Sequence, residues 1–187
     1  IMASIIKANE LQDFGGNSII TSDGAGTITL SSGMNTAINA AAVNTPAFRA
    51  TMSADQDGNS SESNVKVAFN TETFDEGSCY DPTTNYRFTV PLGEAGKYLI
   101  IAHTHTRASG SYSGKTCRLY KNGSFLTESQ TATAGDNLHA SRTNNEEVAT
   151  IENLSVGDYI EVYVKCFGST FSIEAEGAYF SACKLNI

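Results

Sequence analysis

The chain of 187 residues has no tryptophan, few arginines and no long apolar run. Tryptophan and arginine most often anchor tight binding sites, so their scarcity argues against a strongly built one. No apolar stretch approaches the roughly 20 residues that span a bilayer. Residues 1–10 also lack the basic flank and apolar core of a signal peptide. We therefore expect no membrane insertion, and we expect synthesis in a cytoplasm.

Positive charge is scarce as well, because 12 Lys and Arg stand against 20 Asp and Glu for a formal net charge of -8. Proteins that bind nucleic acid carry a basic face that neutralises phosphates, and no stretch of this sequence provides one. The length suits one well-buried domain with an extension and would hardly hold two full domains. Nucleic acid is not an expected partner.

Catalytic motifs are missing too. No Gly-x-Ser-x-Gly elbow accompanies the three histidines, and no motif fixes a pair of carboxylates. The segment Ser113-Gly114-Lys115-Thr116 imitates the end of a phosphate-binding loop, but Ser109 stands where that motif needs its first glycine. We interpret residues 113–116 as a mobile loop, and we predict that the chain is not an enzyme and needs no cofactor.

The sequence contains no pattern that supplies a complete set of metal ligands. His103 and His105 place two imidazoles on one strand face without a third ligand, so we interpret them as a surface pair or a pair lining an oligomer axis. Residues 55–59 hold oxygen ligands, but Gly58 at the fourth position and Lys66 at the twelfth exclude a helix-loop-helix calcium site. We interpret them as a polar loop. The sequence assigns no metal site, and it leaves open whether an ion binds on an oligomer axis.

The four cysteines are even in number but widely spaced, with no Cys-x-x-Cys pair: Cys79, Cys117, Cys166 and Cys183. Each lies in or beside an apolar strand pattern. We predict that they are free thiols buried in the folded domain.

Residues 1–45 form an arm whose amino-acid composition differs from that of the rest of the chain. Glycine, serine, asparagine and alanine surround short apolar pieces, which cannot bury a core of their own. Residues 19–21 and 27–30 read as strands of a hairpin, since turn residues separate them. Residues 37–43 suit one or two helical turns. We expect this arm to become ordered by docking onto another molecule.

From Thr45 onward, short alternating apolar runs are separated by turn signals, which is typical of a sandwich or barrel. Residues 65–69 alternate as a strand. Asn122-Gly123 predicts a hairpin, because this pair accepts the positive φ angles of a tight turn. Two further strands, residues 98–105 and 159–167, carry bulky groups on both faces.

The second face of those two strands indicates an oligomer, since large apolar groups on both faces would otherwise meet water. The residues predicted to face outward, and hence to form the interface, are Leu99, Ile101, His103, His105, Tyr159, Tyr163 and Phe167.

The region from Pro46 to the C-terminus resembles the globular head of the complement q-subcomponent family, a branch of the tumour-necrosis-factor-like jelly rolls. The resemblance lies in the order of several short motifs. The motifs that carry the resemblance are Ala47-Phe48, Val67-Ala68-Phe69-Asn70, Tyr80-Asp81-Pro82-Thr83-Thr84, Phe88-Thr89-Val90-Pro91, Gly96-Lys97-Tyr98, Leu119-Tyr120-Lys121-Asn122-Gly123, Leu154-x-x-Gly157-Asp158 and Phe180-Ser181-Ala182-Cys183-Lys184-Leu185. Residues 85–87 are one longer than the family's pattern, residues 91–96 carry two extra, and Ala182 replaces the usual final glycine. The resemblance implies an all-β jelly-roll sandwich over residues 46–187.

The family's members are typically homotrimers, so the resemblance implies a homotrimer here. It does not imply complement function, because no collagen-like stalk precedes the head. The opening of the arm is similar to the N-termini that viruses of bacteria attach to such heads. We therefore expect a bacteriophage virion protein, a trimeric capsid decoration whose arm, residues 1–45, docks on capsid or tail proteins.

The alternative is the tip of a tail fibre or spike that binds a host receptor or glycan. The candidate contacts in predicted loops are Tyr86, Tyr112 and His139. A long fibre would need a shaft, and about 45 residues extend at most about 150 Å. The short arm favours decoration.

Overall fold

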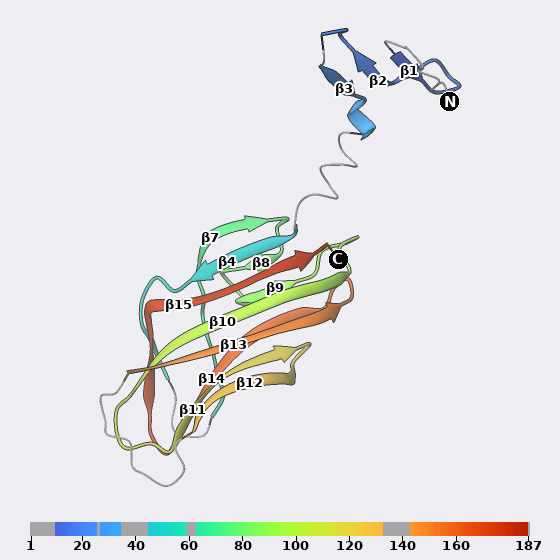
Figure 1. Cartoon of the computed structure of the whole chain (residues 1–187). Helices are drawn as coiled ribbons and strands as arrows, with labels where there is room; N and C mark the ends of the chain where they lie inside the picture. Colours follow the sequence, from blue (N-terminus) through green and yellow to red (C-terminus); the bar gives the residue numbers. More distant parts are fainter. Residues whose placement is uncertain (1–9, 26, 35–44, 59–62, 133–142, 187) are drawn as a thin grey trace, which may run out of the picture. The chain divides into compact units, whose positions relative to one another are not determined.

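The computed structural model of the chain describes residues 10–25, 27–34, 45–58, 63–132 and 143–186 (Figure 1). It divides into two compact units, one ending at Val43 and one beginning at Asn44. This break lies next to the predicted boundary between residues 45 and 46. No helix in the described ranges is long and apolar enough to cross a membrane.

The first unit holds a small antiparallel sheet of β1 (Glu10–Gln12), β2 (Ser18–Ser22) and β3 (Ile28–Leu30), in that order. β2 and β3 form the predicted hairpin, whereas β1 was not predicted. Asp23 shapes the turn, since its Oδ1 accepts hydrogen bonds from the backbone N–H of Ala25 at 2.7 Å and of Thr27 at 3.0 Å. The helical turns predicted at residues 37–43 fall outside the described residues.

The second unit is a sandwich of two antiparallel sheets (Figure 1). The first, called the β10 sheet here, has the order β13 (Thr143–Leu154), β10 (Gly96–Ala108), β15 (Phe171–Leu185), β4 (Ala47–Thr51) and β7 (Thr71–Glu76), with β5 (Gln56–Asp57) pairing with β15. The second, the β14 sheet, has the order β12 (Ser124–Ala132), β11 (Gly114–Lys121), β14 (Tyr159–Phe167), β9 (Arg87–Thr89) and β8 (Tyr80–Asp81), with β6 (Val65–Lys66) pairing with β14. Most successive connections cross from one sheet to the other, as from β9 to β10, from β12 to β13 and from β14 to β15, whereas β11 and β12 stay in one sheet.

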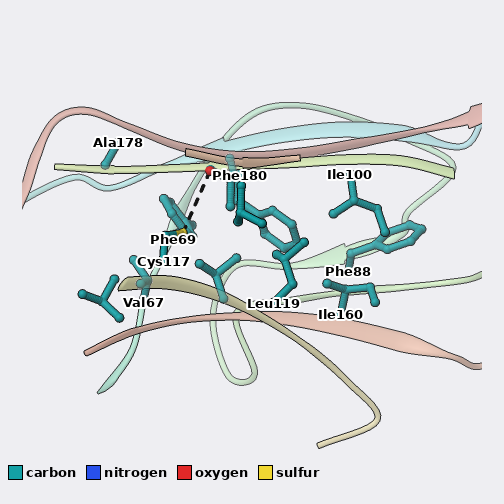
Figure 2. Packing of buried hydrophobic residues seen from close by; sticks show 14 of the residues in the cluster. Val67, Phe69, Phe88, Ile100, Cys117, Leu119, Ile160, Ala178 and Phe180 are labelled. Atoms are coloured by element: carbon teal, nitrogen blue, oxygen red, sulfur yellow. Dashed lines mark hydrogen bonds between the residues drawn. The ribbon is translucent and has the colours of Figure 1, made fainter. Parts of the chain in front are cut away.

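The core fills the space between the sheets, because alternate residues of each strand point inward. In Figure 2, Ile100 and Phe180 from the β10 sheet meet Leu119 and Ile160 from the β14 sheet, and all four are fully buried. Aromatic rings fill one part of this core, where Phe48 stacks on Tyr80 with ring centroids 4.5 Å apart. The predicted inward and outward faces of β10 are confirmed.

The hairpin between β11 and β12 is confirmed as well. Asn122 and Gly123 adopt φ angles of 52° and 76°, which define a tight turn with two positive φ values. The Asn122 side chain fixes the turn by donating to Asp158 at 2.8 Å and accepting from the backbone N–H of Tyr159 at 2.9 Å.

Three local predictions were wrong or incomplete. Of the predicted mobile loop at residues 113–116, Ser113 is exposed, whereas residues 114–116 are the buried start of β11, where Lys115 pairs with Cys166 of β14. The strand predicted over residues 65–69 is regular only at Val65–Lys66, although Val67 stays buried and donates its N–H to Val162. The polar loop at residues 55–59 contains the short strand β5. In each case a partner distant in sequence decides the backbone pairing.

Candidate functional site

The outer face of the β10 sheet carries two adjacent rows of mostly apolar side chains. The strand register places them directly opposite one another: Ile151, Leu99, Cys183 and Ala47 form the first row, and Ala149, Ile101, Ser181 and Arg49 the second. Phe74 of β7 continues the second row beside Arg49. We call these residues the apolar rows.

The apolar rows surround a shallow hollow of about 210 Å³, whose lining includes Leu99, Ile101, Phe74 and Cys183. Two of their large side chains remain strongly exposed, Ile151 at 57% and Phe74 at 45%. Contiguous apolar surface of this kind makes the β10 face a candidate interaction surface. The rows include Leu99 and Ile101, the first two predicted interface residues.

The next row is polar and aromatic. Glu147, His103 and Tyr179 lie side by side across three strands. The His103 ring stacks on Tyr179 with centroids 5.5 Å apart, and the Tyr179 hydroxyl donates to Glu147 at 3.2 Å. Arg49 lies 4.1 Å from the centre of the Tyr179 ring. Burial and the neighbouring Glu147 carboxylate raise the pKa of Tyr179.

The other predicted interface residues, Tyr159, Tyr163 and Phe167, lie in β14 and therefore on the opposite outer face of the sandwich. Each ring there lies near a cation of the same chain: Arg87 is 4.2 Å from Tyr159, Lys66 is 5.9 Å from Tyr163, and Lys165 is 4.6 Å from Phe167. Lys66 also pairs with Glu161 on this face. The chain itself thus partly covers the β14 face.

The candidate receptor contacts do not form a cluster among the described residues. Tyr112 is 2% exposed, so its placement in a contact loop was wrong: its ring lies inside the sandwich, 4.5 Å from the Lys115 ammonium. Tyr86 is half-buried directly after a turn and has a φ of 48°. His139 lies outside the described residues.

A buried polar cluster around Lys115 and Glu146 was not predicted. The Lys115 ammonium donates to the carbonyl of Thr106 at 2.7 Å, and the Thr106 hydroxyl donates to Glu146 at 3.0 Å. Burial raises the pKa of Glu146 to about 7, against the lowering effects of Thr106 and Lys115. Burial lowers the pKa of Lys115. An alternating Thr-x-Thr at residues 104 and 106 was the one available signal of polar positions facing inward.

The cysteines occur as free thiols, three buried and Cys183 half-buried in the apolar rows. The prediction that all four are buried is therefore incomplete. Burial raises the pKa of Cys117 to about 12, which keeps this thiol protonated and unreactive. Within the described ranges, no group of three or more His, Cys, Asp or Glu side chains could hold a metal ion.

Comparison with known proteins reveals the fold alone. No family model matches the chain, and no curated protein sequence matches it. The globular domain of zebrafish complement 1qA protein gives a TM-score of 0.51 at 18% identity and covers 75% of this chain and 97% of that one. Eiger TNF from S. frugiperda gives 0.52 at 15% identity, covering 74% and 90%. Murine APRIL gives 0.51 at 15% identity, covering 74% and 98%. The head is thus a jelly roll of the complement and tumour-necrosis-factor type, as predicted.

Proposed function

We propose that this chain is a non-enzymatic virion protein that forms a homotrimer through the outer face of the β10 sheet and docks onto a virus particle through its arm. The observation that supports a homotrimer is the exposure of the apolar rows. The fold resembles a family whose members are typically trimeric. Burying such surface contributes about 25 cal/mol per Å², so an isolated head would be disfavoured. Cyclic closure also keeps the exposed sheet from propagating into fibres.

A cyclic trimer gives the two predicted faces different roles. Around a three-fold axis, each copy presents one surface to one neighbour and a different surface to the other. The β10 face, with Leu99 and Ile101, is the better candidate for the main contact. The β14 face, where cations cover Tyr159 and Phe167, is the weaker one.

The arm supports docking because its described residues form no core. No described residue of the arm, within 10–25 and 27–34, is buried, and three large apolar side chains are strongly exposed: Leu11 at 56%, Ile28 at 66% and Phe14. A three-stranded sheet needs a buried face to be stable on its own. We therefore propose that a capsid or tail protein covers this sheet.

Decoration of the capsid remains our first choice over a receptor-binding tip. The tip hypothesis relied on exposed aromatic residues in loops, and the burial of Tyr112 removes one of its three candidates. We propose the virion as the location, with synthesis in the host cytoplasm.

Labelling purified particles with an antibody against the head tests this proposal. Label over the shell supports decoration, label only at the tail supports the tip, and particles without label contradict a virion protein. A chain lacking residues 1–44 should fold but stay off the particles, whereas the full chain should join them. Normal incorporation of the shortened chain would refute the role of the arm.

A further inference from the structure

His103 and His105 project from the outer face of β10, next to the apolar rows, and both are half-buried. Their Nδ1 atoms lie 2.9 Å from backbone carbonyl oxygens, His103 from that of Gly177 and His105 from that of Glu176. A carbonyl oxygen can only accept, so Nδ1 carries the hydrogen in both rings. In the neutral imidazole the lone pair is therefore on Nε2, the tautomer that metal-binding histidines adopt.

The backbone of β15 is shaped to hold the two rings this way. The pairing between β10 and β15 shifts register between His103 and His105, which is the mark of a β-bulge. Gly177 takes a φ of 79° at this bulge. The carbonyl oxygens of Gly177 and Glu176 lie against Nδ1 of the two histidines instead of pairing with the backbone of β10. The stacking of His103 on Tyr179 fixes the plane of that ring as well.

Two nitrogen ligands from one chain are too few for a stable site, because zinc binds four ligands in structural sites and three protein ligands in catalytic ones. Among the described residues of one chain, no group of three or more His, Cys, Asp or Glu side chains could hold a metal ion. The further ligands can come from a second copy of the chain. His103 and His105 border the apolar rows, through which we propose that the copies pack.

We propose that the assembled homotrimer binds a divalent transition metal ion between the His103 and His105 side chains of adjoining copies. This rests on the proposed homotrimer. Imidazole nitrogen suits zinc, nickel and copper, and zinc is the simplest probe because it undergoes no redox change. Each copy contributes one third of the ligand set, so binding and assembly stabilise one another.

The test uses the full chain, stripped with EDTA and titrated with zinc chloride by calorimetry, with metal content measured after gel filtration. We expect roughly one or two zinc ions per three chains, and a rise in the melting temperature of the trimer. The double variant His103→Asn with His105→Asn keeps a hydrogen-bond donor at the position of Nδ1 but lacks Nε2. It should still form trimers and bind zinc at least about 10-fold more weakly. His139→Ala, which removes the third histidine of the chain, is the matched control and should bind like the wild type.

Sedimentation in EDTA and in zinc separates the two proposals. A trimer that binds no zinc, or a double variant that binds it as well as the wild type, would overturn the metal site and leave the proposed function intact. Zinc bound with equal affinity by a dissociated chain would also overturn it, because the site would then be complete in one copy. A chain that is monomeric in both buffers would overturn the homotrimer and the shared site together.

Discussion

Lys115 and Glu146 are ionisable side chains inside the sandwich, 0% and 1% exposed. Both converge on Thr106, through its carbonyl and its hydroxyl respectively. Burying two charges costs several kcal/mol per ion unless hydrogen bonds and mutual attraction offset it. Glu146 Oε1 has no hydrogen-bond partner among the described residues, so the charged form of this carboxyl is incompletely stabilised. Protonation of Glu146 therefore favours the folded state.

The first prediction concerns pH. Burial raises the pKa of Glu146 from 4.5 to about 7 in the folded chain, so the folded state holds more protons than the unfolded state between these values. Its contribution to stability is fully present below pH 4.5 and is lost as the pH rises through about 7. The lowered pKa of Lys115 acts in the opposite sense at alkaline pH.

Glu146→Gln removes this titration while keeping the shape of the side chain. From pH 5 to pH 8, the wild type should lose on the order of 2 kcal/mol more unfolding free energy than the variant. Urea unfolding at one fixed chain concentration measures the difference. Parallel pH curves for the two proteins would show that Glu146 is not the group responsible.

Single residues show where sequence reasoning succeeded and where it failed. Alternation placed Ile100 inside and Ile101 outside correctly, because side-chain direction in a strand is a local property. Tyr112 and Lys115 were misplaced, because polar and glycine-rich neighbours suggested a loop. Their burial depends on β14 and β10, which lie far away in the sequence, and on partners such as Thr106 that no short motif specifies.

At the scale of elements, the hairpin between β11 and β12 was predictable because two residues encode it. Gly123 adopts a φ of 76°, where a residue with a side chain is disfavoured. A Cβ atom at this position would meet the Tyr159 hydroxyl oxygen at 3.5 Å, which is ordinary contact. The cost of a substitution should therefore come from the backbone angle alone.

The second prediction tests whether the backbone angle alone sets the cost of a substitution at Gly123. Gly123→Ala should lower the unfolding free energy by about 1–2 kcal/mol, because alanine is strained at this φ. Gly123→Asn should cost less, since asparagine tolerates the left-handed region better. Urea unfolding of the three proteins at equal concentration gives the order. A Gly123→Asn variant less stable than Gly123→Ala would mean that side-chain contact, and not φ, sets the cost.

The bulge in β15 was not predictable in the same way. Its glycine, Gly177, is visible in the sequence, but a glycine within a strand pattern either marks a bulge or only weakens the strand. Only the register with β10 shows that the carbonyls of Glu176 and Gly177 meet His103 and His105. The tautomers of these histidines, and hence the proposed metal site, could not be inferred before the pairing was known.

For the whole molecule, the jelly-roll class was predictable because its motifs keep their order along the chain, and turn positions determine which strands can pair. The distribution of the outward residues over the two faces was not predictable. Alternation tells that Leu99 and Tyr163 both point outward, but the sheet to which each strand belongs is a property of the topology. The structure therefore separates residues that the sequence had grouped.

The third prediction uses Cys183 as a reporter of assembly. This thiol is half-buried in the apolar rows of one chain, whereas the other three are buried in the core. In the trimer, a thiol reagent should label Cys183 slowly, because the neighbouring copy covers it. In denaturant, all four thiols should react. Rapid labelling of one thiol per native chain, absent in Cys183→Ser, would contradict an interface over this row.

The last prediction compares two exposed side chains on opposite sheets. Ile151 of β13 is 57% exposed and borders Leu99 in the apolar rows, whereas Phe125 of β12 is 54% exposed and follows the hairpin of the β14 sheet. Aspartate at either position would meet water in a single chain, so neither change should unfold it. In the trimer, Ile151→Asp would bury an unpaired carboxylate, at a cost of roughly 2 kcal/mol or more per copy. Sedimentation should give about three times the chain mass of 19.9 kDa for the wild type and for Phe125→Asp, and dissociated chains for Ile151→Asp. Dissociation caused only by Phe125→Asp would place the interface on the other sheet, because equal exposure makes the two faces a matched pair.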